Sequence, residues 1–226
     1  MNLVLIPGLL CTQEVWGQIN TLRNEYKCVD ADVISFNSIN AMSNAVIENL
    51  PIGNIAIIGI SMGGYVAIDT AIKLGSKIKK LILINTTSNP VDASTIQERE
   101  KAIKMANNGM LKTVMTMSEG MCYFKPKAEW LSLERKMALD IGASVYIKQQ
   151  RAIIDRENHS RSIRNITADT LIIAGREDKI TPLKDSIHMS KQIKRSCLVI
   201  LEECGHLSTL EKGSEVLDAI KNFLEV

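Results

Sequence analysis

The sequence is short of the residues that mark metal-binding and disulfide-linked proteins. Its 226 residues include three histidines and five cysteines, and the cysteines are odd in number and never in C-x-x-C spacing. We therefore expect no metal site, and we expect free thiols in a reducing compartment such as the cytoplasm. No apolar run approaches the roughly 18 residues of a transmembrane helix, so no membrane span is predicted.

An excess of charge of one sign is also missing. Lys and Arg total 27 and Asp and Glu total 25, which gives a net charge of +2 with both signs mixed along the chain. Without a basic stripe, binding to nucleic acid or to an anionic membrane surface receives no support. The G-x-G-x-x-G and phosphate-binding-loop patterns are absent as well, and no cofactor is predicted.

The N-terminal stretch Met1–Cys11 is apolar but does not fit a lipoprotein signal. No Lys or Arg precedes the apolar run, Pro7 and Gly8 interrupt it, and large leucines stand where small residues should precede a cleavage site. We therefore interpret the stretch as a strand and a loop of the mature protein.

The most informative stretch is Ile55–Gly64, which has the sequence I-A-I-I-G-I-S-M-G-G. Its apolar first half predicts a strand buried on both faces of a parallel sheet, and the residues after it have helical spacing. Between strand and helix lies a G-x-S-x-G motif centred on Ser61. In this context the motif holds the serine in a strained turn, with its hydroxyl exposed at the carboxyl edge of the sheet. The alternative is a tight turn whose serine only caps the helix.

Strands and helices alternate along most of the chain. Strands are expected at 2–6, 27–34, 55–59, 80–84, 170–174 and 197–201, and helices at 13–23, 40–50, 65–74, 181–193 and 211–224. Thr12 is the expected N-cap of the first helix, and Thr181 and Pro182 are the expected N-cap and first residue of the fourth. This alternation predicts an α/β fold with a mostly parallel six-stranded sheet and helices on both faces.

Residues 86–165 interrupt the alternation with an uneven helical pattern. This segment holds six of the ten methionines, namely Met105, Met110, Met115, Met117, Met121 and Met137. One interpretation is a helical subdomain that packs against itself, with methionine filling gaps. The other, which we favour, is a lid whose flexible apolar lining shapes a pocket over the serine. We therefore predict a core of residues 1–85 and 166–226 and a small helical cap of residues 86–165.

Three polar residues follow three different strands of the predicted sheet. Ser61 follows the third strand, Asp178 the fifth and His206 the sixth, and the carboxyl ends of parallel strands meet at one edge. This order fits a serine nucleophile, an orienting carboxylate and a histidine base. If the strand order reverses between the first and third strands, the loop after the first strand faces the serine. The backbone N–H groups of Leu9 and Met62 then point at a developing oxyanion.

Other residues compete for these roles. Glu177 adjoins the predicted acid, but adjacent loop residues point in different directions. His159 lies in a charged stretch and His188 in the middle of a helix, and we expect both to face solvent. Cys204 lies away from the serine turn, so we expect an unreactive thiol. Taken alone, His206 can equally be a loop histidine that caps the last helix.

Together these motifs resemble those of the α/β-hydrolase superfamily, over essentially the whole chain. The matching segments are P-G-L-L-C-T-Q-E-V-W, G-I-S-M-G-G, A-G-R-E-D-K-I-T-P and E-C-G-H-L. The resemblance implies the roles given above for Ser61, Asp178 and His206, an oxyanion hole from Leu9 and Met62, and a cap where the methionine-rich segment falls.

Two features depart from the pattern of that superfamily. The chain begins at the superfamily's third strand, so the resemblance implies a sheet of six strands without the first two edge strands. Pro7 stands where many members have a histidine, which removes a polar group and leaves the bracing of the loop after the first strand unassigned.

We therefore expect a carboxylesterase-like serine hydrolase that cleaves a small carboxylic ester or related acyl compound through an acyl-enzyme intermediate. The same triad serves C–C bond hydrolysis, thioester hydrolysis and acyl transfer, and these alternatives stay open. A ligand-binding receptor with this fold and negligible turnover, or a protein-interaction scaffold, also stays open. The identity of the small-molecule substrate and the oligomeric state leave no signature in the sequence.

Overall fold

The computed structural model describes residues 1–118 and 120–225, with only the backbone for residues 110–118. Six strands of this described part form one parallel sheet in the order β2-β1-β3-β4-β5-β6. They are β1 (Asn2–Ile6), β2 (Lys27–Asp30), β3 (Ile55–Ile60), β4 (Lys80–Ile84), β5 (Asp169–Gly175) and β6 (Ser196–Leu201). The predicted α/β fold is confirmed.

The strand order reverses between β1 and β3, which is the condition under which the loop after the first strand was expected to face the serine. β1 pairs with β2 on one side and with β3 on the other, so Val4 lies opposite both Val29 and Ile57. All six residues of β3 are buried, which suits its unbroken apolar sequence. The loops that follow β1 and β3 therefore lie on opposite sides of a crevice at the carboxyl edge, where ligands bind in open α/β sheets.

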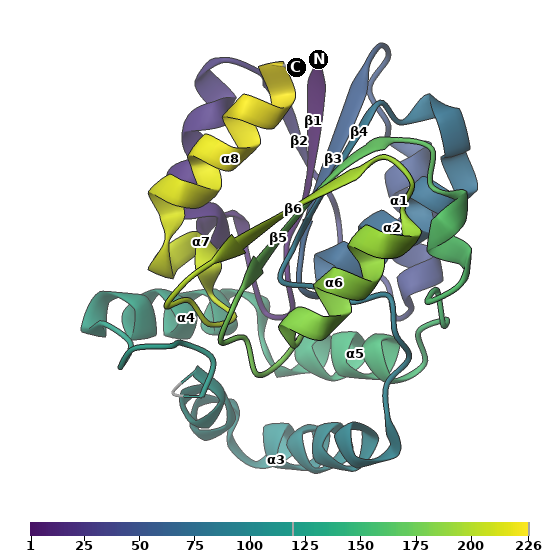
Figure 1. Cartoon of the computed structure of the whole chain (residues 1–226). Helices are drawn as coiled ribbons and strands as arrows, with labels where there is room; N and C mark the ends of the chain where they lie inside the picture. The colour runs from purple at the N-terminus through teal and green to yellow at the C-terminus, as the bar shows by residue number, and fades with distance from the viewer. Residues whose placement is uncertain (119, 226) are drawn as a thin grey trace.

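Helices cover both faces of the sheet (Figure 1). One face packs against α1 (Ile39–Glu48), α2 (Met62–Leu74) and α6 (Leu183–Gln192), and the other against the 3₁₀ segment η1 (Gln13–Asn24) and α8 (Gly213–Glu225). Short segments η2 (Gly75–Lys77), η3 (Ser162–Asn165) and α7 (Ser208–Glu211) complete the connections. The helices α1 and α2 bury apolar residues at helical spacing, such as Met42 and Val66, against the sheet.

Within the described residues, three α-helices lie between β4 and β5. They are α3 (Ala93–Ser118), α4 (Ala128–Ile141) and α5 (Ala143–Ile154), and they lie beyond the carboxyl edge of the sheet (Figure 1). Helix α3 packs on both others, and Ile153 of α5 joins the apolar core under the sheet. The side chains of Met110, Met115 and Met117 lie outside the described residues. The division into a core and a cap stays a prediction.

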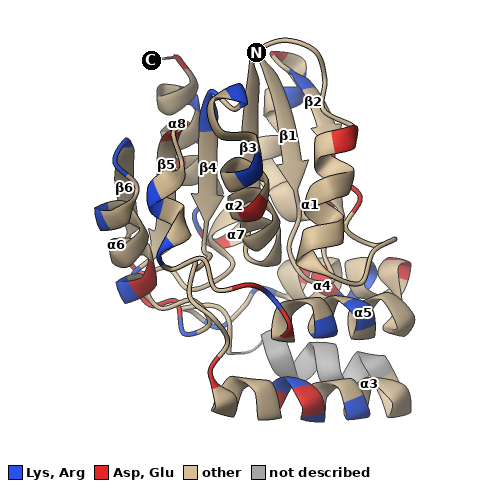
Figure 2. Cartoon of the chain, turned by 90° about the vertical axis from the view of Figure 1, so that its right-hand side faces the viewer, with Lys and Arg blue, Asp and Glu red and all other residues tan. Residues whose placement is uncertain are grey.

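Charged residues of both signs are spread over the helices and loops (Figure 2). No helix in the described ranges is both long enough and apolar enough to cross a lipid bilayer.

The second strand is shorter than the predicted 27–34. β2 ends at Asp30, and the Asp32 carboxylate then accepts hydrogen bonds from the N–H groups of Ile34 and Ser35, both at 3.0 Å. This side-chain turn takes the chain away from the sheet. Because β2 is an edge strand, few contacts oppose that departure.

Two helices also differ from the prediction. The first is a 3₁₀ segment broken at Gly17, where φ is 49° and an added Cβ would approach Thr209 O at 3.1 Å. The last, predicted as one helix over 211–224, is split into α7 and α8 at Lys212, which has φ −132°. In the same turn, the Glu211 carboxylate accepts hydrogen bonds from the N–H groups of Gly205 and Leu207 in the preceding loop.

We predict that Gly63→Ala destabilises the fold. Helix α2 crosses β1 so closely that a Cβ on Gly63 would overlap Ile6 O and lie 2.6 Å from Pro7 O, and neither backbone atom can move cheaply. Overpacking of this kind costs about 1–3 kcal/mol or more. Urea unfolding measures the loss. The control is Gly213→Ala, whose Cβ would meet Gln18 at an ordinary 3.6 Å. Equal stability of the two variants would contradict this packing.

Candidate active site

Ser61 lies in the sharp turn between β3 and α2. Its backbone has φ 52° and ψ −117°, a conformation that non-glycine residues rarely adopt. The Ser61 N–H donates to Ile84 O at 3.0 Å and the Thr86 hydroxyl donates to Ser61 O at 2.8 Å, so β4 and the residues after it hold the turn. The Ser61 side chain makes no capping hydrogen bond to the described helix. The alternative that this serine only caps α2 is therefore wrong.

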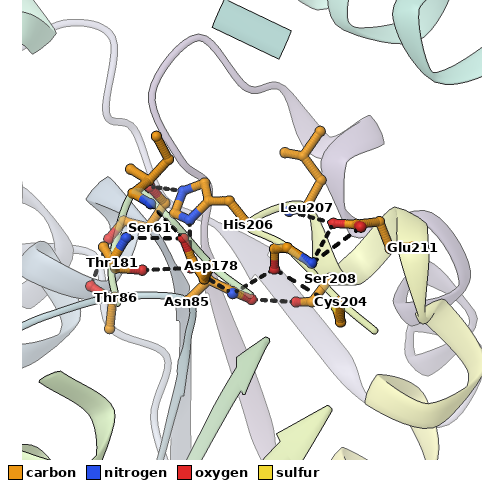
Figure 3. A network of polar contacts seen from close by, with 12 residues as sticks. Ser61, Asn85, Thr86, Asp178, Thr181, Cys204, His206, Leu207, Ser208 and Glu211 are labelled. Atoms are coloured by element: carbon orange, nitrogen blue, oxygen red, sulfur yellow. Dashed lines mark hydrogen bonds and ion pairs between the residues drawn. The ribbon is translucent and has the colours of Figure 1, made fainter. Parts of the chain in front are cut away.

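The structure brings together the three side chains that follow the third, fifth and sixth strands (Figure 3). His206 Nε2 lies 2.9 Å from Ser61 Oγ, and His206 Nδ1 lies 2.8 Å from Asp178 Oδ2. His206 and Asp178 are 4% and 5% exposed. An imidazole whose Nδ1–H donates to a carboxylate presents Nε2 as an acceptor. This geometry can move a proton from the serine hydroxyl to the histidine.

The Asp178 carboxylate is the most heavily bonded group of the site. Besides His206, its oxygens accept from the N–H groups of Ile180 (2.8 Å) and Thr181 (3.0 Å), the Thr181 hydroxyl (2.7 Å) and the Asn85 amide (2.8 Å). Burial opposes the charge, but the adjacent His206 and these donors prevail and lower the pKa of Asp178 to about 2. Thr181 is therefore not the N-cap that was predicted, because it binds this carboxylate, and α6 begins at Leu183 with Pro182 as its N-cap.

Asn85 and Ser208 belong to the same network and were missed by the sequence analysis (Figure 3). The Asn85 amide also donates to Gly205 O at 3.2 Å, and the Ser208 hydroxyl donates to Asn85 Oδ1. Asn85 has a positive φ of 43° and directly follows β4. Because Asn85 follows a central strand, it could have been identified from the sequence by the same argument that selected Ser61, Asp178 and His206.

The loop that carries His206 is fixed by backbone contacts on both sides. The Glu211 carboxylate accepts from the N–H groups of Gly205 (3.1 Å), Leu207 (3.1 Å) and Tyr123 (2.8 Å), and the His206 N–H donates to Met121 O at 2.6 Å. A Cβ on Gly205 would lie 2.8 Å from the Tyr123 N, so the two backbones touch. The segment before α4 therefore packs directly on the histidine loop.

Leu9 and Met62 are the residues whose N–H groups were predicted to face an oxyanion. Leu9 belongs to the loop after β1, and Met62 is the first residue of α2. Neither N–H has a hydrogen-bond acceptor within the described residues. Their role in an oxyanion hole stays a prediction.

A glutamine braces the loop after β1. Leu10 has a positive φ of 56°, and its N–H donates to Gln149 Oε1 at 3.0 Å. Gln149 is fully buried on α5, and its amide donates in turn to Val33 O at 3.1 Å. Gln149 thus supplies the support that the resemblance left unassigned at Pro7, and no pattern in the sequence pointed to it.

A cavity of about 390 Å³ opens over Ser61 and His206. Its wall is mostly apolar and includes Leu9, Val15, Met121, Met137 and Ile153. The cavity lies between the sheet edge and helices α3, α4 and α5, so these helices supply part of the wall of any substrate pocket.

Two residues considered as alternatives for the catalytic roles make other contacts. Glu177 accepts a hydrogen bond from the Cys204 N–H at 2.9 Å, so it points away from His206. Cys204 is fully buried, and its Sγ lies 3.7 Å from Gly205 O. Burial raises the pKa of this thiol well above its usual range, which fits the unreactive thiol that was expected.

The expectation that His159 and His188 face solvent is wrong for His159. His159 is 8% exposed, with Nε2 at 3.3 Å from Asp69 Oδ1 and Nδ1 at 2.9 Å from Ser162 Oγ. The partner Asp69 lies on α2, and its distance along the sequence hid the pairing. His188 is half-buried, and its Nε2 lies 3.0 Å from Ser160 O.

Comparisons with known proteins agree with this architecture. The model of the Hydrolase_4 family, described as serine aminopeptidase, S33, matches residues 29–213, which is most of the chain. The chain belongs to this family of α/β-hydrolases. The resemblance inferred from the sequence motifs is thereby confirmed.

Curated relatives of the chain are named for different substrates. The 2-hydroxymuconate semialdehyde hydrolase of Pseudomonas putida is 25% identical over 186 residues, covering 79% of this chain and 65% of the relative. The chain therefore spans just under two thirds of that relative's length. The pimeloyl-acyl-carrier-protein methyl ester esterase of Nitrosomonas europaea is 23% identical over 246 residues, covering 97% of this chain and 95% of the relative.

Solved structures match the hydrolase over its full length. A thermophilic esterase from Thermogutta terrifontis, solved with malate bound, has a TM-score of 0.90 at 22% identity, covering 100% of this chain and 89% of that one. The enol-lactonase from Burkholderia xenovorans has a TM-score of 0.86 at 18% identity, covering 99% and 91%. At these identities the likeness concerns the fold alone.

We predict that protonation of Asp178 in acid lowers the free energy of unfolding. Because the pKa of Asp178 falls from its ordinary 3.8 to about 2 on folding, its contribution of roughly 2 kcal/mol is complete above about pH 4 and is lost between pH 4 and 2. Urea midpoints measured from pH 5 to 2 should fall less steeply for Asp178→Asn than for the natural protein. Asp140→Asn, which changes an exposed carboxyl, is the control. An unchanged slope for Asp178→Asn would disprove the linkage.

We predict that Glu211→Gln loosens the histidine loop. The glutamine keeps the size of the side chain but turns one acceptor oxygen into a donor that faces backbone N–H groups. Losing such charge-assisted bonds costs about 1.5–3 kcal/mol. The amides of Gly205 and Leu207 should then exchange with deuterium faster than in the natural protein. Glu215→Gln, on the exposed face of α8, is the matched control, and unchanged exchange at both amides would refute the role.

Proposed function

We propose that the chain is a serine hydrolase that cleaves a small carboxylic ester, or a related acyl compound, through an acyl-enzyme intermediate. The observation that carries the proposal is the unbroken line of contacts from Ser61 Oγ through His206 to Asp178, at 2.9 and 2.8 Å. In this proposal Ser61 is the nucleophile, His206 the base and Asp178 the orienting acid. No cofactor is required.

The first half of the reaction transfers the acyl group to Ser61. His206 Nε2 takes the hydroxyl proton while Oγ forms a bond to the carbonyl carbon. The carbonyl oxygen becomes an oxyanion, which the N–H groups of Leu9 and Met62 stabilise; one such donor is worth roughly 2.7–4 kcal/mol. The bond to the alcohol oxygen then breaks, and His206 returns its proton to the departing alcohol.

The second half releases the acid. His206 takes a proton from a water molecule as the water oxygen bonds to the acyl carbon, and the Ser61 ester bond then breaks with return of that proton to Oγ. Asp178 stabilises the protonated imidazole in both halves and fixes its tautomer. Because the pKa of Asp178 is about 2, the carboxylate stays ionised throughout.

We predict that Ser61→Ala lowers kcat/KM for a short-chain nitrophenyl ester by several orders of magnitude, since the nucleophile is gone. Ser61→Gly is the companion variant, because glycine accepts the positive φ at this position without strain. Circular dichroism checks that both variants fold. A fluorophosphonate should label the natural protein stoichiometrically at Ser61 and neither variant. A folded variant that keeps most of the activity would remove the assignment.

A second candidate function is cleavage of a C–C bond. It draws on the relative from Pseudomonas putida that is named for 2-hydroxymuconate semialdehyde. Comparing kcat/KM for this compound, a nitrophenyl ester, an acyl thioester and an aminoacyl nitroanilide ranks the possible reactions. Labelling of Ser61 without turnover of any of them would favour a ligand-binding receptor.

We also propose that helices α3, α4 and α5 act as a cap that shapes the acyl pocket. Their residues line the cavity over Ser61, which supports this role. The free thiols of the five cysteines favour a reducing compartment, and we propose the cytoplasm.

A further inference from the structure

One guanidinium lines the apolar cavity over Ser61. Arg99, on α3, contributes to the wall together with Ala102 of the same helix and Ile153 of α5. Its Nη1 donates to Gln150 Oε1 at 2.6 Å. Its Nε–H is buried and has no acceptor among the described residues. A buried donor without an acceptor is costly, so this N–H favours a ligand that accepts a hydrogen bond.

No carboxylate of the described residues forms an ion pair with Arg99. A guanidinium offers five donors in a flat fork that matches the two oxygens of a carboxylate. The Gln150 contact uses only part of that fork. Arg99 is thus a cation in a mostly apolar cavity whose charge has no ion-pair partner within the described chain.

The Arg99 side chain is also held in place before any ligand arrives. Gln150 is 1% exposed and also lines the cavity, and its amide donates to the Tyr146 hydroxyl at 2.7 Å. Tyr146 is fully buried between the packed helices. Because this chain of contacts fixes one end of the guanidinium, little conformational entropy is lost when a ligand binds the other end.

The other charged residues of the cavity wall differ from Arg99. Glu98 and Lys179 are exposed, so water solvates them. Glu134 has an interaction of its own. Glu134 is a carboxylate on the same wall and could attract a cationic substrate. The experiment must therefore distinguish an anionic substrate from a cationic one.

We propose that Arg99 forms an anion subsite of the active site and that the substrate carries a carboxylate in addition to the acyl bond that is cleaved. This proposal rests on the proposed function for the reaction itself. The carboxylate accepts hydrogen bonds from the Arg99 fork, and the scissile carbonyl lies at Ser61 in the same cavity. The substrate class is a monoester of a dicarboxylic acid or an acyl compound of equivalent charge.

The test compares matched substrates. Mono-nitrophenyl glutarate, nitrophenyl pentanoate and an amine-terminated ester of the same acyl length differ only in the charge at the end of the acyl group. A pair of phenyl acetates with and without a ring carboxylate places the charge on the leaving group. The natural protein should prefer the anionic member in one of the two series.

Arg99→Gln should lower kcat/KM for the preferred anionic ester by about 10- to 100-fold and leave the neutral ester within about threefold, because charge-assisted hydrogen bonds are lost only for the former. Lys104→Gln is the matched control, because Lys104 is an exposed cation on the same helix. An anionic-to-neutral ratio that is unchanged in Arg99→Gln, or a preference for the amine-terminated ester, would overturn the proposal.

A binding measurement separates this proposal from the proposed reaction. In Ser61→Ala protein, calorimetry should detect binding of glutarate, and adding Arg99→Gln should weaken it by a similar factor. If glutarate binding depends on Arg99 but the natural protein turns over none of the esters, the subsite is retained and the reaction is rejected. Ester turnover with no effect of Arg99 on either measurement would do the reverse.

Discussion

The ionised carboxylate of Asp178 is the group on which the rest of the site depends. An isolated charge at 5% exposure is strongly unfavourable, and it persists here because donors from three segments converge on it. They come from the end of β4, from the loop after β5 and from the loop after β6. The need to solvate one buried carboxylate therefore joins three separate strand ends into a single network.

That network explains why the positions of neighbouring residues are not independent. Asn85 bonds both the carboxylate and Gly205 O, and Ser208 bonds Asn85 in turn. A shift of the histidine loop would leave several buried polar groups without partners at once, each at a cost of about 1–3 kcal/mol. The distance between His206 and Ser61 is thus fixed by the polar contacts around the carboxylate as well as by the sheet.

The helices over the sheet edge are joined to this network at one end. Met121 and Tyr123 precede α4, and their backbones bond the His206 loop directly or through Glu211. At the other end, Gln149 of α5 holds the N–H of Leu10. Any movement of these helices that admits substrate must therefore leave both contacts in place or alter the geometry around Ser61.

The sequence predicted the parts of the molecule that follow from strand order and from local turn chemistry. The buried sheet follows from unbroken apolar runs, and the proximity of Ser61, Asp178 and His206 follows from their places after parallel strands. Gln149 and Glu211 escaped prediction because a helical glutamine and a glutamate near a helix start are common, and only tertiary contacts give them a role. His159 was misjudged for the same reason, since its partner Asp69 is far away in sequence and close in space. The end of β2 depended on a side-chain turn at Asp32 that outweighed the β-propensity of Val33 and Ile34.

The sheet edge and the helical segment make different contributions to the site. In the proposed reaction, the reacting groups lie on loops whose positions are set by the sheet. Because many different chains share such a sheet, these groups indicate a type of bond more readily than a particular substrate. The cavity wall comes instead from α3, α4 and α5, where the alternation of strands and helices gives no guidance. Arg99 lies on that wall, and its apolar surroundings give one guanidinium much greater electrostatic weight than it would have in water. In the proposed reaction, selectivity therefore depends on a few polar atoms of the helical segment, whereas the chemistry depends on the edge of the sheet.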